Sequence, residues 1–128
     1  MACKENGPLC VGLDTAPSYL PPEVLKKYET PAKAVLAYNT ELINACAKHS
    51  GCFKVQIAYY EAMGLEGLQT YVETLKILKK INNFNIPVIA LTADAVAGAK
   101  EKYLSEGFTN YLAKPIDKNE LVKVLNEV

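Results

Sequence analysis

Four side chains at or near the ends of apolar runs are our candidates for residual ligand binding: Asp14, Lys54, Thr92 and Lys114. Hydroxyl and ammonium groups donate hydrogen bonds to small anions such as phosphate or sulfate, whereas a carboxylate accepts them from hydroxyl and amide donors. Because ligands of parallel α/β sheets bind at the carboxyl ends of the strands, the positions of Asp14, Thr92 and Lys114 are suited to binding. No catalytic role is assigned to any of them.

An ordinary structural role is the favoured interpretation for each of these residues. A carboxylate at a strand end, such as Asp14, is typical of turns in which it accepts backbone N–H groups. Lys54 is expected to extend its ammonium group to solvent or to pair with Asp14. Thr92 is expected to cap a helix, and Lys114 to keep a structural position.

Metal and cofactor chemistry is not expected from the cysteines. The chain contains Cys3, Cys10, Cys46 and Cys52, whose spacings fit no zinc knuckle, and one histidine, His49. In a protein of this size and compartment, reduced thiols are more common than ligands or disulfides. We therefore expect no metal and no cofactor. Cys10 and Cys52 would be neighbours if the strands that they begin are paired.

Composition limits the classes of partner. The 128 residues carry 14 Lys+Arg and 14 Asp+Glu, so the net charge is zero. A nucleic-acid groove or a polybasic membrane face needs an excess of positive charge, and no apolar run approaches the roughly 20 residues of a membrane span. The first residues have no apolar signal stretch. We expect a cytoplasmic protein without nucleic-acid or membrane partners.

The pattern of apolar residues predicts strands and helices in alternation. Strands are expected over residues 9–14, 53–58, 86–91 and 110–113, and helices over residues 30–50, 65–81, 95–105 and 117–128. Thr30 is the expected N-cap of the first long helix, with Pro31 at its first position, and Asp117 opens the last helix. Four βα units in succession predict one α/β domain over residues 1–128 with a parallel sheet.

Residues from about 8 to 80 resemble orotidine 5′-phosphate decarboxylase, a TIM barrel. The resemblance lies in residues 8–14, which read PLCVGLD, and residues 53–61, which read FKVQIAYYE. Gly64 and Gly67 follow at the spacing of that family. If this part determines the fold, the chain is half a TIM barrel with strand order 1-2-3-4.

This resemblance also implies roles for individual residues. Asp14 and Lys54 match positions that belong to a charged network around the substrate ribose. The family continues with the motif Asp-x-Lys-x-x-x-Asp on the third strand, whose lysine protonates the product carbanion. Residues 88–94 read VIALTAD and have no lysine at that position.

Residues from about 85 to 128 instead resemble the C-terminal part of a response-regulator receiver domain. The resemblance lies in residues 86–93 (IPVIALTA), Gly107 and Phe108, and residues 111–116 (YLAKPI). It implies an open, flavodoxin-like three-layer sandwich, which is our preferred fold.

In receivers, the residues that match Thr92 and Lys114 flank a phosphoryl group on an aspartate, and Tyr111 matches an aromatic that reports the switch. The Lys114–Pro115 bond is expected to be cis. The receiver family needs a phosphoacceptor aspartate at the end of the preceding strand, where residues 56–58 read QIA.

Both sites are therefore incomplete, and we expect that the chain is not an enzyme. The function predicted from the sequence is that of an engineered chimeric α/β scaffold, with a fragment junction near residues 81–85 and neither decarboxylase nor phosphorelay activity. The alternative is a module that binds phosphate or another small anion between Asp14, Thr92 and Lys114. Because the first strand is an apolar sheet edge, we also expect a homodimer formed through it.

Overall fold

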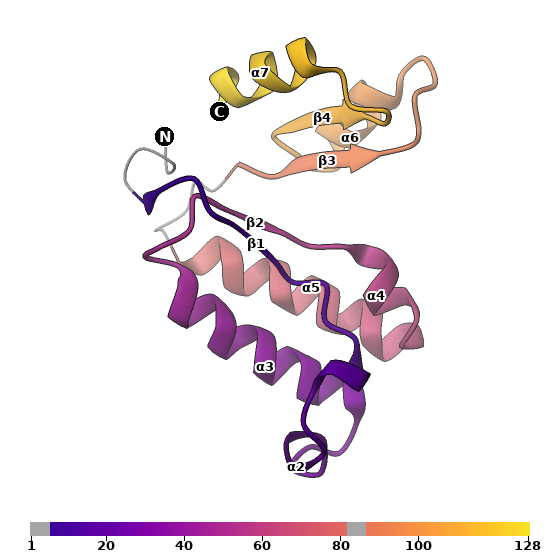
Figure 1. Cartoon of the computed structure of the whole chain (residues 1–128). Coiled ribbons are helices and arrows are strands. Elements are labelled where there is room, and N and C mark those ends of the chain that lie inside the picture. Colours follow the sequence, from indigo (N-terminus) through magenta and orange to yellow (C-terminus); the bar gives the residue numbers. More distant parts are fainter. Residues whose placement is uncertain (1–5, 82–86) are drawn as a thin grey trace. The chain divides into compact units, whose positions relative to one another are not determined.

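Helices and strands alternate along residues 6–81 and 87–128, which the computed structural model describes (Figure 1). The chain divides into two compact units, residues 1–84 and residues 85–128. We describe each unit by itself. The predicted fragment junction near 81–85 lies outside the described residues except for Ile81, so the junction and the single-domain organisation stay predictions.

Unit 1, residues 1–84, is built around two short strands. Its elements are β1 (Cys10–Gly12), a 3-10 helix (Pro17–Tyr19), α2 (Pro22–Leu25), α3 (Pro31–Cys46), β2 (Cys52–Lys54), α4 (Ile57–Glu61) and α5 (Gly64–Lys80). β1 pairs with β2 in parallel, and Cys10 is the register partner of Cys52. The expectation that these two cysteines are neighbours is therefore confirmed.

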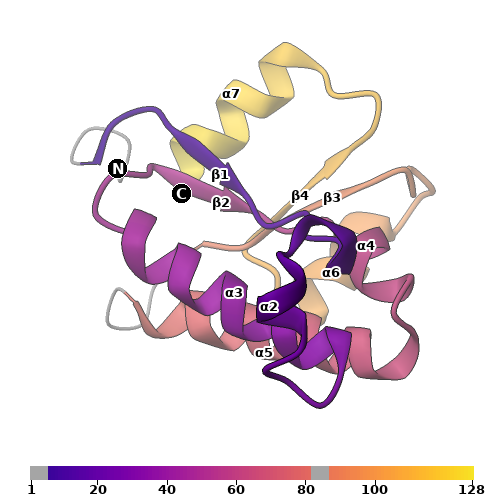
Figure 2. The same cartoon turned by 60° about the horizontal axis from the view of Figure 1, so that its bottom comes forward.

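One face of the β1–β2 pair packs on the long helices. Both figures show α3 and α5 on the same side of the two strands (Figures 1 and 2). Val11 and Phe53 point to that side and contact a buried cluster of Leu13, Ile43 and Leu78. The alternate residues of the strands, among them Cys10 and Lys54, are exposed. This alternation is the two-residue period of a strand with one covered face.

Helix α3 begins where the sequence predicts. Thr30 is its N-cap, with the side chain accepting a hydrogen bond from the Lys33 amide at 3.3 Å, and Pro31 occupies the first helical position. The second strand, in contrast, ends at Lys54, and residues 57 and 58 belong to α4 rather than to a strand. The prediction of a strand to residue 58 was wrong because a short apolar run fits a strand and a buried helix turn equally well.

Unit 2, residues 85–128, has its own parallel pair. Its elements are β3 (Ile89–Thr92), α6 (Ala99–Ser105), β4 (Asn110–Ala113) and α7 (Lys118–Glu127), and β3 pairs with β4. Asn110 bonds to Glu127 of α7, whereas the next residue, Tyr111, stacks on Tyr103 of α6. Successive strand residues point to opposite faces, so α6 and α7 cover opposite faces of this sheet. The Asp117 cap of α7 and the cis Lys114–Pro115 bond are confirmed.

The predicted single sheet of four strands is not confirmed. The described residues form an α/β structure with two separate two-stranded parallel sheets, β1–β2 and β3–β4. Each strand is only three or four residues long and is paired within its own unit. The flavodoxin-like sandwich and the half-barrel order therefore stay proposals about the arrangement of four strands.

Candidate functional site

Asp14 and Lys54 meet at the carboxyl ends of β1 and β2. The Leu13 amide donates to the Lys54 carbonyl at 2.8 Å, which extends the parallel ladder to the residue before Asp14. The Lys54 ammonium donates to Asp14 Oδ2 at 2.5 Å. This hydrogen bond to a carboxylate raises the pKa of Lys54 above its ordinary value. The predicted Asp14–Lys54 pair is present.

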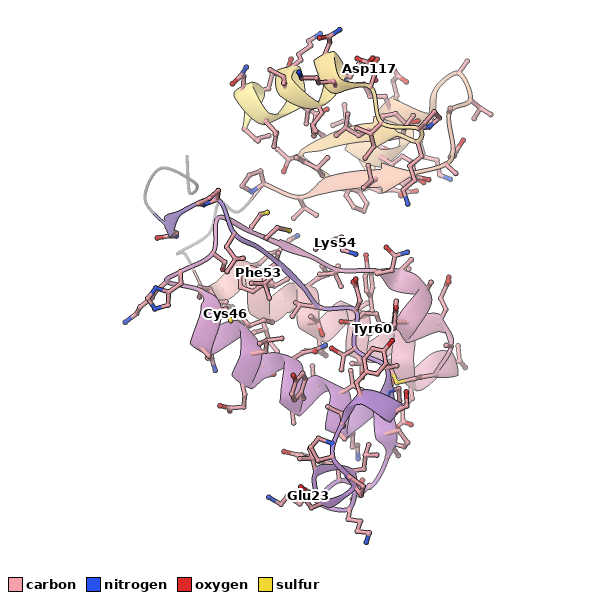
Figure 3. The ribbon with its side chains drawn as sticks, in the orientation of Figure 1. Glu23, Cys46, Phe53, Lys54, Tyr60 and Asp117 are labelled. Atoms are coloured by element: carbon pink, nitrogen blue, oxygen red, sulfur yellow. The ribbon has the colours of Figure 1, made fainter. Side chains whose placement is uncertain are left out.

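The pair lies on the face of the strands opposite α3 and α5. Figure 3 shows Phe53 pointing from β2 towards α3 and α5, with Lys54 on the opposite face. About half of the Lys54 side chain and a quarter of the Asp14 side chain are exposed, at 51% and 27%. Gly12 lies beside them: an added Cβ would be 3.4 Å from Asp14 Oδ2 and 3.9 Å from Lys54 Cε, which are ordinary van der Waals contacts.

The second oxygen of the Asp14 carboxylate has no hydrogen-bond partner in the described part of the chain. Asp14 Oδ1 is buried and accepts no hydrogen bond among the residues that the structure describes. An unsatisfied buried acceptor costs on the order of 1–3 kcal/mol, more when it is charged. A ligand hydroxyl that donates to this oxygen would remove that cost. Asp14 Oδ2 is thus bonded to Lys54, whereas Oδ1 accepts no hydrogen bond from the described residues.

A buried polar network holds the backbone on either side of Asp14. Thr15 Oγ1 donates to Asn39 Oδ1 at 2.7 Å, Asn39 Nδ2 donates to the Tyr60 hydroxyl at 2.9 Å, and that hydroxyl donates to the Leu13 carbonyl at 2.9 Å. Asn39 and Tyr60 are inaccessible to solvent, and Thr15 is nearly so. Sequence reasoning did not identify this network.

A signal for Asn39 was present in the sequence. Asn39 lies four residues after Val35 and four before Ile43, so it occupies the apolar face of α3. A polar side chain on such a face must find a buried partner. The identity of that partner, Tyr60, follows only from the fold.

Thr92 and Lys114 form the second predicted pair, at the carboxyl ends of β3 and β4. The Lys114 amide donates to the Thr92 carbonyl at 2.7 Å, so the two residues are adjacent. The Thr92 hydroxyl accepts from the Asp94 amide at 3.1 Å and from the Tyr103 hydroxyl at 3.3 Å. Thr92 therefore anchors the turn after β3. The prediction that it caps a helix was wrong, because the next helix, α6, begins at Ala99 with Gly98 as its N-cap.

Tyr111 lies beside this pair. Its hydroxyl donates to the Asp94 carbonyl, and its ring stacks on Tyr103 with centroids 5.5 Å apart. Burial, followed by the nearby Asp94, raises the pKa of Tyr111. The structure thus brings together Asp14 with Lys54 in unit 1 and Thr92 with Lys114 in unit 2. The predicted anion site between Asp14, Thr92 and Lys114 draws on both units, so it stays a prediction.

Neither a metal-ion site nor a membrane-spanning helix is found in the described residues. Within residues 6–81 and 87–128, no group of three or more His, Cys, Asp and Glu side chains is arranged to hold a metal ion. In the same residues, no helix has the length and apolar character of a membrane span.

Comparison with known proteins gives one consistent similarity. No family model matches the chain. Over 97 residues it is 45% identical to the orotidine 5′-phosphate decarboxylase of Clostridium perfringens, a stretch that covers 76% of this chain and 33% of that protein. The decarboxylases of Clostridium novyi and Clostridium botulinum are 47% and 44% identical over 77 residues, which cover 60% of this chain and 27% of each relative. The chain spans a third or less of the length of these relatives.

The longest of these similarities extends beyond the N-terminal fragment that the sequence motifs define. Wherever a stretch of 97 residues is placed in a chain of 128, it includes residues 32–97. The aligned region therefore contains β2, α5 and β3. The motifs in the sequence had placed the end of the decarboxylase-like segment at about residue 80.

The expectation that the chain is not an enzyme was wrong. It was drawn from the incompleteness of both the decarboxylase and the receiver site, but the chain is 45% identical over 76% of its length to proteins named as an enzyme. The absence of one motif residue is a weaker indication than similarity along most of a chain. The N-terminal part of this chain resembles orotidine 5′-phosphate decarboxylase.

Proposed function

We propose that the chain acts in the decarboxylation of orotidine 5′-phosphate and that Asp14 and Lys54 bind the substrate ribose. The observation that carries the proposal is the Asp14–Lys54 pair at the ends of adjacent parallel strands. In this pair, Asp14 Oδ1 accepts no hydrogen bond from the described residues. Similarity to proteins named orotidine 5′-phosphate decarboxylase supports it.

The chemistry of the pair suits a sugar hydroxyl. A hydroxyl is both donor and acceptor, so it can donate to Asp14 Oδ1 and accept from Lys54. The ammonium group has three donors, of which Asp14 Oδ2 takes one. Hydrogen bonds to charged groups are stronger than those between neutral groups, which favours a ligand hydroxyl over water at this position. Holding the ribose fixes the nucleotide for reaction.

Proton transfer is not assigned to this pair. The third-strand lysine that the resemblance implies has no counterpart in β3, Ile89–Thr92. Asp14 and Lys54 are therefore proposed as binding residues that orient the substrate.

Calorimetric titration and turnover test the proposal together. We expect orotidine 5′-phosphate to bind and its characteristic absorbance to fall with time. Asp14→Asn and Lys54→Ala should each weaken binding at least tenfold, the effect of about 1.4 kcal/mol. Lys33→Ala is the matched control, because Lys33 forms an exposed pair with Glu29 elsewhere in unit 1. Failure of the folded wild-type protein to bind the nucleotide would refute the proposal.

A second proposal concerns residues 85–128 and the origin of the chain. We propose that this part derives from a receiver-like fold and that the whole is a chimeric, engineered α/β chain with its strands in a flavodoxin-like sheet. Support comes from the division of the chain at residues 84 and 85 and from the adjacency of Thr92 and Lys114. An experimentally determined order of the four strands tests it, and strands that stay in two sheets would contradict it.

The adjacency of Thr92 and Lys114 also supports anion binding as a second candidate function. Inorganic phosphate should then raise the melting temperature of the protein, because a ligand stabilises the state that binds it. The increase should disappear in Lys114→Ala. If millimolar phosphate does not raise the melting temperature, this function is excluded.

A further inference from the structure

We infer that the buried network of Thr15, Asn39 and Tyr60 is a positioning device for Asp14, which sets the direction in which its carboxylate faces Lys54. This inference rests on the proposed role of Asp14 and Lys54 in binding. The hydrogen bonds of the network join Thr15, Asn39, Tyr60 and the Leu13 carbonyl and do not involve the Asp14 carboxylate or Lys54, so the three are positioning residues rather than binding residues.

The hydrogen bonds and the backbone together form a closed ring. Starting at Thr15, the ring passes through Asn39 and Tyr60 to the carbonyl of Leu13, and the backbone returns through Asp14 to Thr15. Asp14 is thus the one residue between two anchored neighbours. A residue held on both sides has little freedom to rotate its Cα–Cβ direction, which determines where its carboxylate can lie.

Further contacts hold Leu13 and Tyr60, two members of this ring. The Leu13 side chain is fully buried against Ile43 and Leu78, and the Leu13 amide is bonded to Lys54 on the neighbouring strand. Tyr60 is packed with Val35 and Ala34 of α3. Tyr71 meets the Tyr60 ring at its edge, with centroids 5.4 Å apart. Leu13 and Tyr60 are therefore supported by residues of β2, α3 and α5.

The protonation of Tyr60 suits this role. Burial raises the pKa of Tyr60 to about 12, so its hydroxyl keeps its proton and donates to the Leu13 carbonyl at neutral pH. A helix residue near the carboxyl end of β2 thereby holds the carboxyl end of β1. In Figure 3 Tyr60 and Lys54 are both labelled, and the Tyr60 ring is on the side of the 3-10 helix and α3.

The alternative is that the network only fills the core with satisfied polar groups. In that case its loss would lower stability but leave the Asp14–Lys54 pair unchanged. Stability alone cannot separate the two cases. The pKa of the Lys54 ammonium group can separate them, because it depends on the position of the Asp14 carboxylate. It is raised mainly by the hydrogen bond to Asp14, and the charge of Asp14 raises it further.

The experiment measures the pKa of the Lys54 ammonium group by NMR titration in the full chain. Tyr60→Phe removes the hydroxyl that holds Leu13, and Thr15→Val removes the hydroxyl on the other side of Asp14. We expect both variants to lower the pKa of Lys54 towards its ordinary value. Affinity for orotidine 5′-phosphate should fall roughly threefold to tenfold, the effect of one lost hydrogen bond.

Tyr71→Phe is the matched control. It removes a hydroxyl from the neighbouring part-buried ring but keeps the ring itself, which meets Tyr60 at its edge. This variant should leave both the pKa of Lys54 and the affinity unchanged. If Tyr60→Phe does not fold, the Thr15→Val variant gives the same readout from the other side.

The two proposals fail in different ways. If the wild-type protein binds no nucleotide, the proposed function fails, while the pKa of Lys54 still tests the network. If nucleotide binds but the folded Tyr60→Phe and Thr15→Val proteins keep both the wild-type pKa of Lys54 and the wild-type affinity, the positioning role is refuted and the network is only structural.

Discussion

The two units of the chain differ in how completely they bury their apolar side chains. In residues 1–84, Leu13, Val35, Ile43 and Tyr60 are fully inaccessible. In residues 85–128, the buried apolar residues are Ala90, Ala99, Leu112 and Val124, which retain 3–6% exposure. A shorter segment encloses less volume for its surface, so its core is small and shallow. Unit 1 can therefore hold buried polar groups in fixed geometry, and the candidate site depends on this capacity.

Truncation of the two cores should give the largest effect. Ile43→Ala, at a fully buried position, is expected to cost about 4 kcal/mol of unfolding free energy. Leu112→Ala in unit 2 should cost about 2 kcal/mol, because its partly open surroundings leave less of a cavity. Urea unfolding followed by tyrosine fluorescence measures both, as the chain has no tryptophan. Equal losses would show that the two cores are packed alike.

The glycines should show a related difference. A Cβ on Gly67 would lie 2.0 Å from the Tyr60 carbonyl oxygen and 2.6 Å from Met63 Cβ, so Gly67→Ala should cost about 3 kcal/mol through overpacking. Gly107 has a φ of 95° but open space around it. Gly107→Ala should therefore cost only about 1 kcal/mol through backbone strain. Similar unfolding curves for the two variants would argue against close packing as the distinguishing property of unit 1.

The pH dependence of stability should reveal the buried Tyr60. Its pKa is about 12 in the folded protein and 10.0 ordinarily. Below pH 10 both states keep the proton; above it the unfolded state loses the proton first, so stability falls as the pH rises from 10 through 12. The loss is roughly 2–3 kcal/mol, and Tyr60→Phe should lack it. Ultraviolet titration in which every tyrosine ionises near pH 10 would contradict this.

Helix caps should matter more in the smaller unit. Asp117 accepts from the amides of Asn119 and Glu120 at 2.8 and 3.0 Å, whereas Thr30 accepts from the Lys33 amide at 3.3 Å. We expect Asp117→Ala to cost about 1.5 kcal/mol and Thr30→Ala about 0.7 kcal/mol. Melting temperatures report the order, and a larger loss for Thr30→Ala would reverse this part of the comparison.

The smallest expected effect concerns self-association, which we propose to involve β1. Leu9 precedes β1 and is 54% exposed, so Leu9→Lys should shift a dimer towards the monomer mass of 14.0 kDa. Val11 would be a poor probe, because it packs on the core. Leu65→Lys, at an 82% exposed position on α5, is the control. Light scattering after size exclusion decides, and a wild-type monomer at high concentration would refute the dimer.

Much of the local structure could be predicted because short signals specify it. The cap at Thr30, the strand Asn110–Ala113 and the cap at Asp117 were predicted from neighbouring residues and are confirmed. The polar part of the buried face of α5 was not predicted. Thr70 and Thr74 are buried there, whereas the apolar Val72 is exposed.

The reason lies in the contact between α3 and α5. Thr70 Oγ1 donates to the Ala32 carbonyl at 3.2 Å, and Thr74 Oγ1 donates to the Thr70 carbonyl at 2.8 Å. Backbone acceptors thus satisfy the two hydroxyls, so polar side chains can replace larger apolar ones on this face. A pattern of apolar residues alone cannot show where such acceptors will lie.

The sequence by itself determined the alternation of strands and helices, the caps that start α3 and α7, and the positions of Asp14 and Lys54 on neighbouring runs. These features depend on interactions between residues close in the chain or on a simple period. Tertiary structure decided that Tyr60 and Asn39, 21 residues apart, enclose the turn at Asp14. It also decided that Asp14 Oδ1 is buried and has no hydrogen-bond partner among residues 6–81 and 87–128. Such properties depend on which distant groups are enclosed together, and packing determines that only after the helices have covered the strands.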